Sequence, residues 1–85
     1  MARTPVPDPA LASAIRRLRE ARGLSRHSLA TGAGITYDSL GRIELAHANP
    51  SWNTVRNIAG ALSASLVELA TAVESKELGA PARAK

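Results

Sequence analysis

The sequence predicts an all-α protein, a compact five-helix bundle that contains a helix-turn-helix. Apolar residues recur at intervals of three and four along nearly the whole chain, and no segment shows the strict alternation of a strand. Capping residues and Gly or Pro stops divide this pattern into five segments with short connections. The chain has one Trp, one Tyr and no Phe, so its core is aliphatic and suits closely spaced helices.

The first predicted helix begins at Asp8-Pro9, because Asp is a good cap and Pro fits the first turn, where an amide hydrogen is not needed. It ends at Gly23. Residues 1–7, with alternating prolines and no periodicity, are expected to form a disordered arm. For most arginines of this helix we expect a solvated surface, with one or two in contact with a binding partner. The apolar stripe is Leu11, Ala14, Ile15, Leu18 and Ala21, and the arginines beside it are Arg16, Arg17, Arg19 and Arg22.

Two short helices joined by a tight turn are predicted between Ser25 and Glu44. Ser25 can cap the first helix and Thr36 the second, because a hydroxyl oxygen at this position accepts a hydrogen bond from a free amide. Gly34 can adopt the left-handed backbone that ends a helix. Apolar residues lie at helical spacing on both sides of the turn: Leu24, Leu29, Ala30 and Ala33 before it, and Ile35, Leu40 and Ile43 after it.

A fourth helix is predicted after the loop that ends in Asn49-Pro50, with Ser51 as its cap. Gly60 inside this helix costs up to about 1 kcal/mol relative to Ala, so it is expected to mark close packing against a neighbouring helix. The positions expected to face inward are Val55, Ile58, Ala59 and Leu62.

Ser65 and Glu68 have the spacing of a capping box, which opens the fifth predicted helix. The sequence Gly79-Ala80-Pro81 stops it. The folded domain is therefore expected over residues 8–78, followed by a flexible basic tail over residues 79–85. Apolar positions of this helix are Leu66, Leu69, Ala70, Val73 and Leu78.

The residue content argues against an enzyme. The chain has no Cys, its only histidines are His27 and His47, and no carboxylate pair lies beside a nucleophile at a catalytic spacing. We therefore expect no catalytic residue, no metal site and no cofactor. No apolar run approaches the roughly 20 residues that span a bilayer, and the N-terminus lacks the apolar segment of a signal peptide. A cytoplasmic protein with no membrane contact is expected.

The positive charge is concentrated in the first two thirds of the chain. Residues 1–56 contain eight arginines and four acidic residues, a net charge of +4, whereas residues 57–78 carry −2. Arginine binds phosphates and guanine edges through its planar guanidinium. The first part of the chain is therefore the part suited to a polyanion such as double-stranded DNA.

Several spaced signals resemble one known family, the Cro and lambda-repressor type of helix-turn-helix, also called the XRE family. The resemblance covers roughly Leu11 to Leu69 and implies a lambda-repressor-like fold. Two departures stand out: Ala46 occupies a place where the family usually has Gly, and Gly41 lies inside the recognition helix. The signals are Ile15-x-x-Leu18-Arg19, Gly23-Leu24-Ser25, Leu29-Ala30, Ala33-Gly34-Ile35-Thr36, Arg42-Ile43-Glu44, Asn49-Pro50-Ser51 and Ile58-Ala59-x-Ala61-Leu62.

The resemblance also implies roles for individual residues. Arg19 and Glu44 stand at the positions of an ion pair that holds the first helix against the recognition helix. Base edges would be read by Tyr37, Asp38 and Arg42, with Ser39 as a further contact; for Asp38, a role at the positive end of the helix is an equal alternative. Phosphate contacts would come from Ser25, Arg26, Thr36, His47, Asn49 and Ser51.

We expect a sequence-specific transcriptional regulator that binds an inverted-repeat operator as a homodimer. One recognition helix reads only a few base pairs, and a twofold pair doubles the site. The alternative is an antitoxin or another protein-interaction module on the same scaffold, with Trp52 as an interface anchor; Trp52 is rather expected to cover the domain edge. Four residues of the fifth predicted helix are candidates for the dimer seam: Leu66, Val67, Ala70 and Val73.

Overall fold

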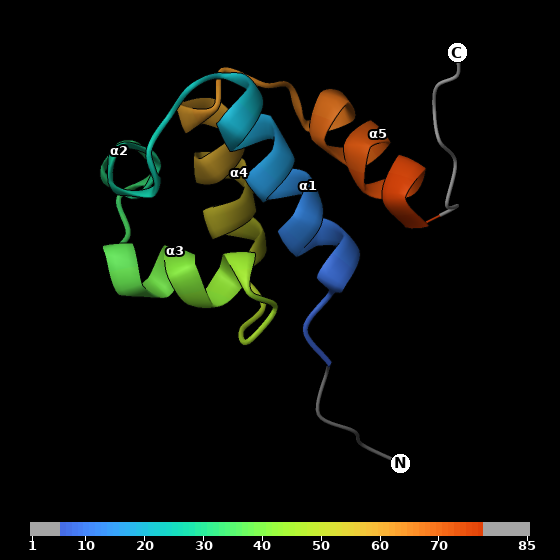
Figure 1. Cartoon of the computed structure of the whole chain (residues 1–85), viewed down its shortest axis with the longest axis horizontal. Coiled ribbons are helices and arrows are strands. Elements are labelled where there is room, and N and C mark those ends of the chain that lie inside the picture. The colour runs from blue at the N-terminus through green and yellow to red at the C-terminus, as the bar shows by residue number, and fades with distance from the viewer. Residues whose placement is uncertain (1–5, 78–85) are drawn as a thin grey trace.

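The computed structural model of the protein describes residues 6–77, which form five helices (Figure 1). Most of the expected arm, the expected tail and Leu78 lie outside the described residues. The all-α prediction is confirmed for the part of the chain that is described. In chain order the helices are α1 (Pro9–Ala21), α2 (Arg26–Ala33), α3 (Tyr37–Glu44), α4 (Trp52–Ala61) and α5 (Leu66–Glu77).

Each helix begins one residue after the residue whose side chain caps it. The Asp8 carboxylate accepts a hydrogen bond from the Ala10 amide at 2.9 Å, and Pro9 takes the first helical position. A serine or threonine hydroxyl accepts the equivalent bond at 3.0 or 3.1 Å in the other four helices. The predicted helix starts are therefore confirmed. The four hydroxyl caps are Ser25, Thr36, Ser51 and Ser65.

The first four helices end with a residue in the left-handed region, followed by an amide that bonds back to the last helical turn. Gly23 and Gly34 take this position after α1 and α2, with φ of 69° and 75°. Ala46 and Ser63 take it after α3 and α4, with φ of 60° and 57°. The His47 amide, for example, donates to the Arg42 carbonyl at 2.8 Å. Ala46 thus keeps the turn that a glycine favours, at the cost of backbone strain.

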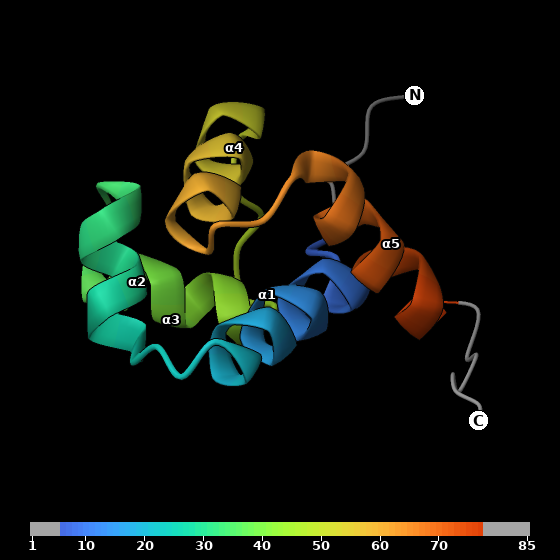
Figure 2. The ribbon, with the colours of Figure 1, turned by 90° about the horizontal axis from the view of Figure 1, so that it is seen from above.

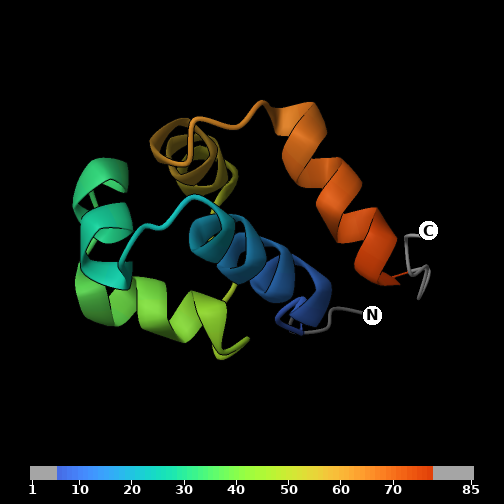
Figure 3. The same ribbon diagram turned by 45° about the horizontal axis from the view of Figure 1, so that its top comes forward.

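The core is aliphatic and draws on every helix. Its largest fully buried apolar side chains are Ile15, Leu29, Leu40, Ile58 and Leu62. Figures 1 to 3 show α2 and α3 on one side of α1 and α5 on the other side. The C-terminal helix packs mainly on α1, so it does not cover α3.

Two expectations about local packing were wrong. Gly60 is exposed, and a Cβ there would meet nothing within 4 Å; the close helix approach is instead at Gly32, where a Cβ would lie 3.1 Å from the Ala61 Cβ. The capping box at the start of α5 is only half formed. Ser65 accepts from the Glu68 amide at 3.0 Å, but the Glu68 carboxylate pairs with Arg22 at 2.9 Å. The tertiary ion pair therefore replaces the local bond.

Candidate nucleic-acid interface

The two faces of α3 differ in burial and chemistry. Leu40 and Ile43 are buried in the core, and the Glu44 side chain has no exposed surface. The opposite face is exposed and polar and carries Asp38 and Arg42. Tyr37, which is 54% exposed, and Ser39 lie on its two edges, so all four sequence-predicted base-reading residues are exposed on α3.

Four arginines are bonded to other helices, although a mainly solvated surface was expected: Arg16, Arg17 and Arg19 in α1, and Arg22 directly after it. Arg16 donates from Nη1 to the Glu44 carbonyl at 2.8 Å, on α3. Arg17 donates from Nη2 to the Ala72 carbonyl at 2.9 Å, on α5. Arg22 forms the ion pair with Glu68 of α5. These guanidinium groups fasten α1 to its two neighbours.

Arg19 and Glu44 form a buried ion pair between α1 and α3. Arg19 Nε lies 2.7 Å from Glu44 Oε2, and Nη2 lies 3.1 Å from Oε1. The Arg19 side chain is 12% exposed. Its third nitrogen, Nη1, donates to the Leu24 carbonyl at 3.0 Å, immediately before α2. One guanidinium therefore fixes the end of α3 relative to both α1 and the start of the helix-turn-helix.

Arg26, which the sequence predicts as a phosphate contact, has its side chain against α3. Its Nε lies 3.3 Å from Glu44 Oε1, and its side chain is 29% exposed. The guanidinium carbon lies 5.7 Å from the centre of the Tyr37 ring. The His27 ring centre is 6.4 Å from that of Tyr37, at an interplanar angle of 42°. The beginning of α2 therefore packs against the beginning of α3.

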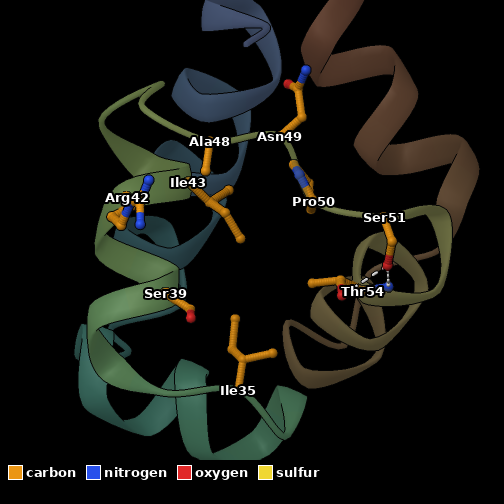
Figure 4. A pocket seen from close by; sticks show the side chains of 9 residues that line it. All are labelled: Ile35, Ser39, Arg42, Ile43, Ala48, Asn49, Pro50, Ser51 and Thr54. Carbon is orange, nitrogen blue, oxygen red and sulfur yellow. Dashed lines mark hydrogen bonds between the residues drawn. The ribbon is translucent and has the colours of Figure 1, made fainter. Parts of the chain in front are cut away.

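A groove of about 300 Å³ separates α3 from the beginning of α4 (Figure 4). Ser39 and Ile43 point into it from α3, and Thr54 faces them from α4 (Figure 4). Arg42 lies on the rim, and its guanidinium has no hydrogen bond or ion pair with any residue that the structure describes. Arg42 thus differs from the anchored arginines of α1.

The loop between α3 and α4 contains three of the predicted phosphate contacts. His47 and Asn49 are exposed, but the Asn49 amide is already engaged: Oδ1 accepts from the Asp8 amide at 3.0 Å, and Nδ2 donates to the Val6 carbonyl at 3.2 Å. Val6 is thereby tied to the domain, although it was expected in the disordered arm. The Ser51 hydroxyl donates to Thr54 Oγ1 at 3.0 Å in addition to capping α4. An anion could therefore bind here through the free backbone amides at the start of α4 and not through the Ser51 hydroxyl.

The profile of the family described as "Helix-turn-helix domain" matches residues 10–72. This chain belongs to that family. Membership confirms the resemblance found in the sequence and the predicted class, a DNA-binding helix-turn-helix protein rather than an enzyme. The helix-turn-helix itself is α2, the turn at Gly34, and α3.

Solved structures of three helix-turn-helix regulators resemble this chain. The restriction-modification controller protein C.AhdI from Aeromonas hydrophila is 31% identical, with a TM-score of 0.69; the match covers 72% of this chain and 92% of that one. The clp gene regulator ClgR from Corynebacterium glutamicum is 23% identical with a TM-score of 0.77, covering 88% of this chain and 96% of that one. A variant of the restriction-modification controller protein C.Esp1396I is 18% identical with a TM-score of 0.81, covering 85% and 94%. The comparison with curated proteins gave no significant match.

Within residues 6–77, no three His, Cys, Asp or Glu side chains are grouped so as to hold a metal ion. In the same part of the chain, no single helix is long and apolar enough to cross a bilayer; α4 and residues Leu66–Ser75 of α5 have the necessary length and composition only together, and they are bent by 101°.

Proposed function

We propose that this helix-turn-helix protein is a sequence-specific transcriptional regulator that reads a short operator with the outward face of α3. The observation that carries the proposal is the exposed Arg42 guanidinium on α3, which has no partner among the described residues. The position of α5 on the far side of α1 supports access of a double helix to α3. The similarity to C.AhdI, a restriction-modification controller, and to ClgR, a gene regulator, supports the regulatory role.

Each outward side chain of α3 suits a different feature of the major groove. Arg42 can grip O6 and N7 of guanine with two parallel N–H donors. Asp38 can accept from N4 of cytosine, and it also favours the positive end of α3. Tyr37 presents a ring edge to a thymine methyl group or its hydroxyl to a phosphate, and Ser39 adds a short hydrogen-bonding group.

Phosphates would be held beside α3 by the amino-terminal ends of helices. The first amides of α2, α3 and α4 have no partner inside their helices, and such ends attract anions. In this proposal Ser25, Thr36 and Ser51 orient those ends as caps, whereas His47, beside the groove, offers an exposed ring. Such contacts fix the register of the protein on DNA without reading its sequence.

We further propose that the regulator binds an inverted repeat as a homodimer, because one α3 reads only a few base pairs and a second copy one turn away, at about 34 Å, doubles the site. An apolar groove of about 450 Å³ supports a seam at α5. Leu69 of this groove is buried in the core, whereas Ala70 is exposed and Trp52 is 64% exposed on the rim. Such a regulator would act in the cytoplasm, and residues 8–78 would form its DNA-binding domain.

Selection of bound fragments from a pool of random duplexes tests the proposal. We expect a palindromic consensus whose half-sites are separated by about one helical turn. A pool without enrichment would contradict sequence reading and favour a protein-interaction module instead.

Sedimentation tests the seam separately. Ala70→Glu places a charge in the exposed part of the α5 groove and is expected to yield a monomer, whereas Asn57→Glu, on the exposed surface of α4, is expected to leave a dimer. If both variants sediment as the unmodified protein does, the dimer seam is not at α5.

A further inference from the structure

The Arg26 side chain runs along α3 and contacts both of its ends. Its Nε bonds to Glu44, the last residue of α3, and its guanidinium lies over the ring of Tyr37, the first residue. Tyr37, Gly41 and Glu44 follow one another at intervals of four and three, which is the spacing of a single helix face. Arg26 therefore spans the length of that face from the neighbouring helix.

Arg26 lies over Gly41. A Cβ built at Gly41 would be 3.6 Å from Arg26 Nη1 and 3.9 Å from its Cδ, in ordinary contact. An alanine would therefore fit at this position, whereas a larger side chain would compete with the guanidinium for the same volume.

The Tyr37 ring is half exposed and takes its position from α2. Arg26 lies over one part of the ring and His27 lies beside it. Within the described part of the chain, the Tyr37 hydroxyl has no hydrogen-bond partner. A side chain that reads a base edge needs a fixed orientation, which packing and bonds to neighbouring groups provide.

We propose that Arg26 is a positioning residue. Fixed by the buried Glu44, it holds Tyr37 in the orientation with which α3 reads DNA, and so it sets sequence preference through Tyr37 in addition to its positive charge. This inference rests on the proposed function of α3.

Lysine at position 26 separates positioning from a simple phosphate contact. A phosphate contact depends mainly on charge, which Arg26→Lys retains. Bonding Glu44 through Nε while the cationic group lies over the Tyr37 ring needs the extended guanidinium, which lysine lacks. The fold tolerates this change, because Arg19 still supplies two bonds to Glu44. Arg17→Lys is the matched control, since Arg17 bonds to α5 on the far side of α1.

The first experiment measures dissociation constants on the duplex that the unmodified protein selects and on a shuffled duplex of the same composition. We expect Arg26→Lys to lower the specificity ratio by about 2- to 150-fold, the range of coupling between contacting residues. Binding to the shuffled duplex and the Arg17→Lys control should change less than about twofold. In a Tyr37→Ala background, Arg26→Lys should have no further effect on the ratio. A retained ratio in the Arg26→Lys protein, or an equal loss in both backgrounds, would overturn the proposal.

The second experiment observes Tyr37 by NMR without DNA. Tyr37 is the single tyrosine of the chain, so its ring signals are unambiguous. We expect contacts between the Tyr37 ring and the Arg26 side chain in the unmodified protein, and rotamer averaging at Tyr37 after Arg26→Lys. Unchanged couplings in that variant would refute positioning while leaving the proposed regulator intact. If Tyr37→Ala kept the full specificity ratio, base reading by Tyr37 and the positioning of Tyr37 would both fail.

Discussion

Replacement of Arg19 by methionine removes the buried ion pair that joins α1 to α3. The Glu44 carboxylate is fully buried and receives two Arg19 bonds, at 2.7 and 3.1 Å. Methionine keeps an apolar chain of similar length but no donor. Breaking a buried pair by removing one partner costs about 3–5 kcal/mol. Because Arg26 Nε still faces the carboxylate at 3.3 Å, we expect a loss in unfolding free energy of about 3 kcal/mol, at the lower end of that range.

Urea denaturation followed by helical circular dichroism measures this loss. The midpoint should fall while the slope with urea is retained, because the surface exposed on unfolding stays the same. In a thermal scan, a loss of about 3 kcal/mol corresponds to a decrease in Tm of about 12–24 °C for a domain of this size.

Arg22→Met is the matched control, with the same substitution at the residue that follows α1. Arg22 and Glu68 pair at 2.9 Å, but their side chains are 28% and 45% exposed. Exposed pairs contribute about 0–1 kcal/mol, so the control should lose no more than that. Equal stability of the Arg19→Met and Arg22→Met proteins would refute the argument that the buried pair holds α3 in place.

Further predictions concern the backbone. Ala46→Gly should raise the unfolding free energy by up to about 1 kcal/mol, since Ala46 has a φ of 60°; a lower urea midpoint would show that the left-handed turn is not strained. Gly60→Ala should stabilise α4 by up to about 1 kcal/mol, because the site is open and exposed. Gly32→Ala should be less stable than Gly60→Ala by about 1 kcal/mol or more, since its Cβ would lie 3.1 Å from Ala61. Equal midpoints for the two alanine variants would exclude a close contact between α2 and α4.

Local chemistry made the helix boundaries predictable from sequence. The caps at Ser25, Thr36 and Ser51 bond to amides three residues away, so both partners are read from one short segment. Helical spacing likewise identified the buried Leu29 and Leu40. The Arg19–Glu44 pairing came from the family resemblance, because no local rule connects two residues 25 positions apart.

Features set by tertiary contacts were not accessible in this way. Arg16 and Arg17 bind backbone carbonyls of α3 and α5, and neither carbonyl is marked in the sequence. Ser63 adopts a left-handed backbone although no glycine signals it. The Glu68 carboxylate pairs with Arg22 and not with the Ser65 amide, because the packing of α5 on α1 brings that guanidinium within reach. For the same reason, the sequence did not predict that Arg26 of α2 lies over Tyr37 of α3.

The central claim is that the outward side chains of α3 read DNA sequence, and binding by the Arg42→Ala protein tests it most directly. The measurement compares dissociation constants on the selected duplex and on a set of duplexes with single base-pair changes, with Arg17→Ala as the charge-matched control. We expect Arg42→Ala to lose about 1–3 kcal/mol on the selected duplex, roughly 5- to 150-fold, and to lose its preference at one base pair. Unchanged affinity together with an unchanged preference at every base pair would contradict the claim.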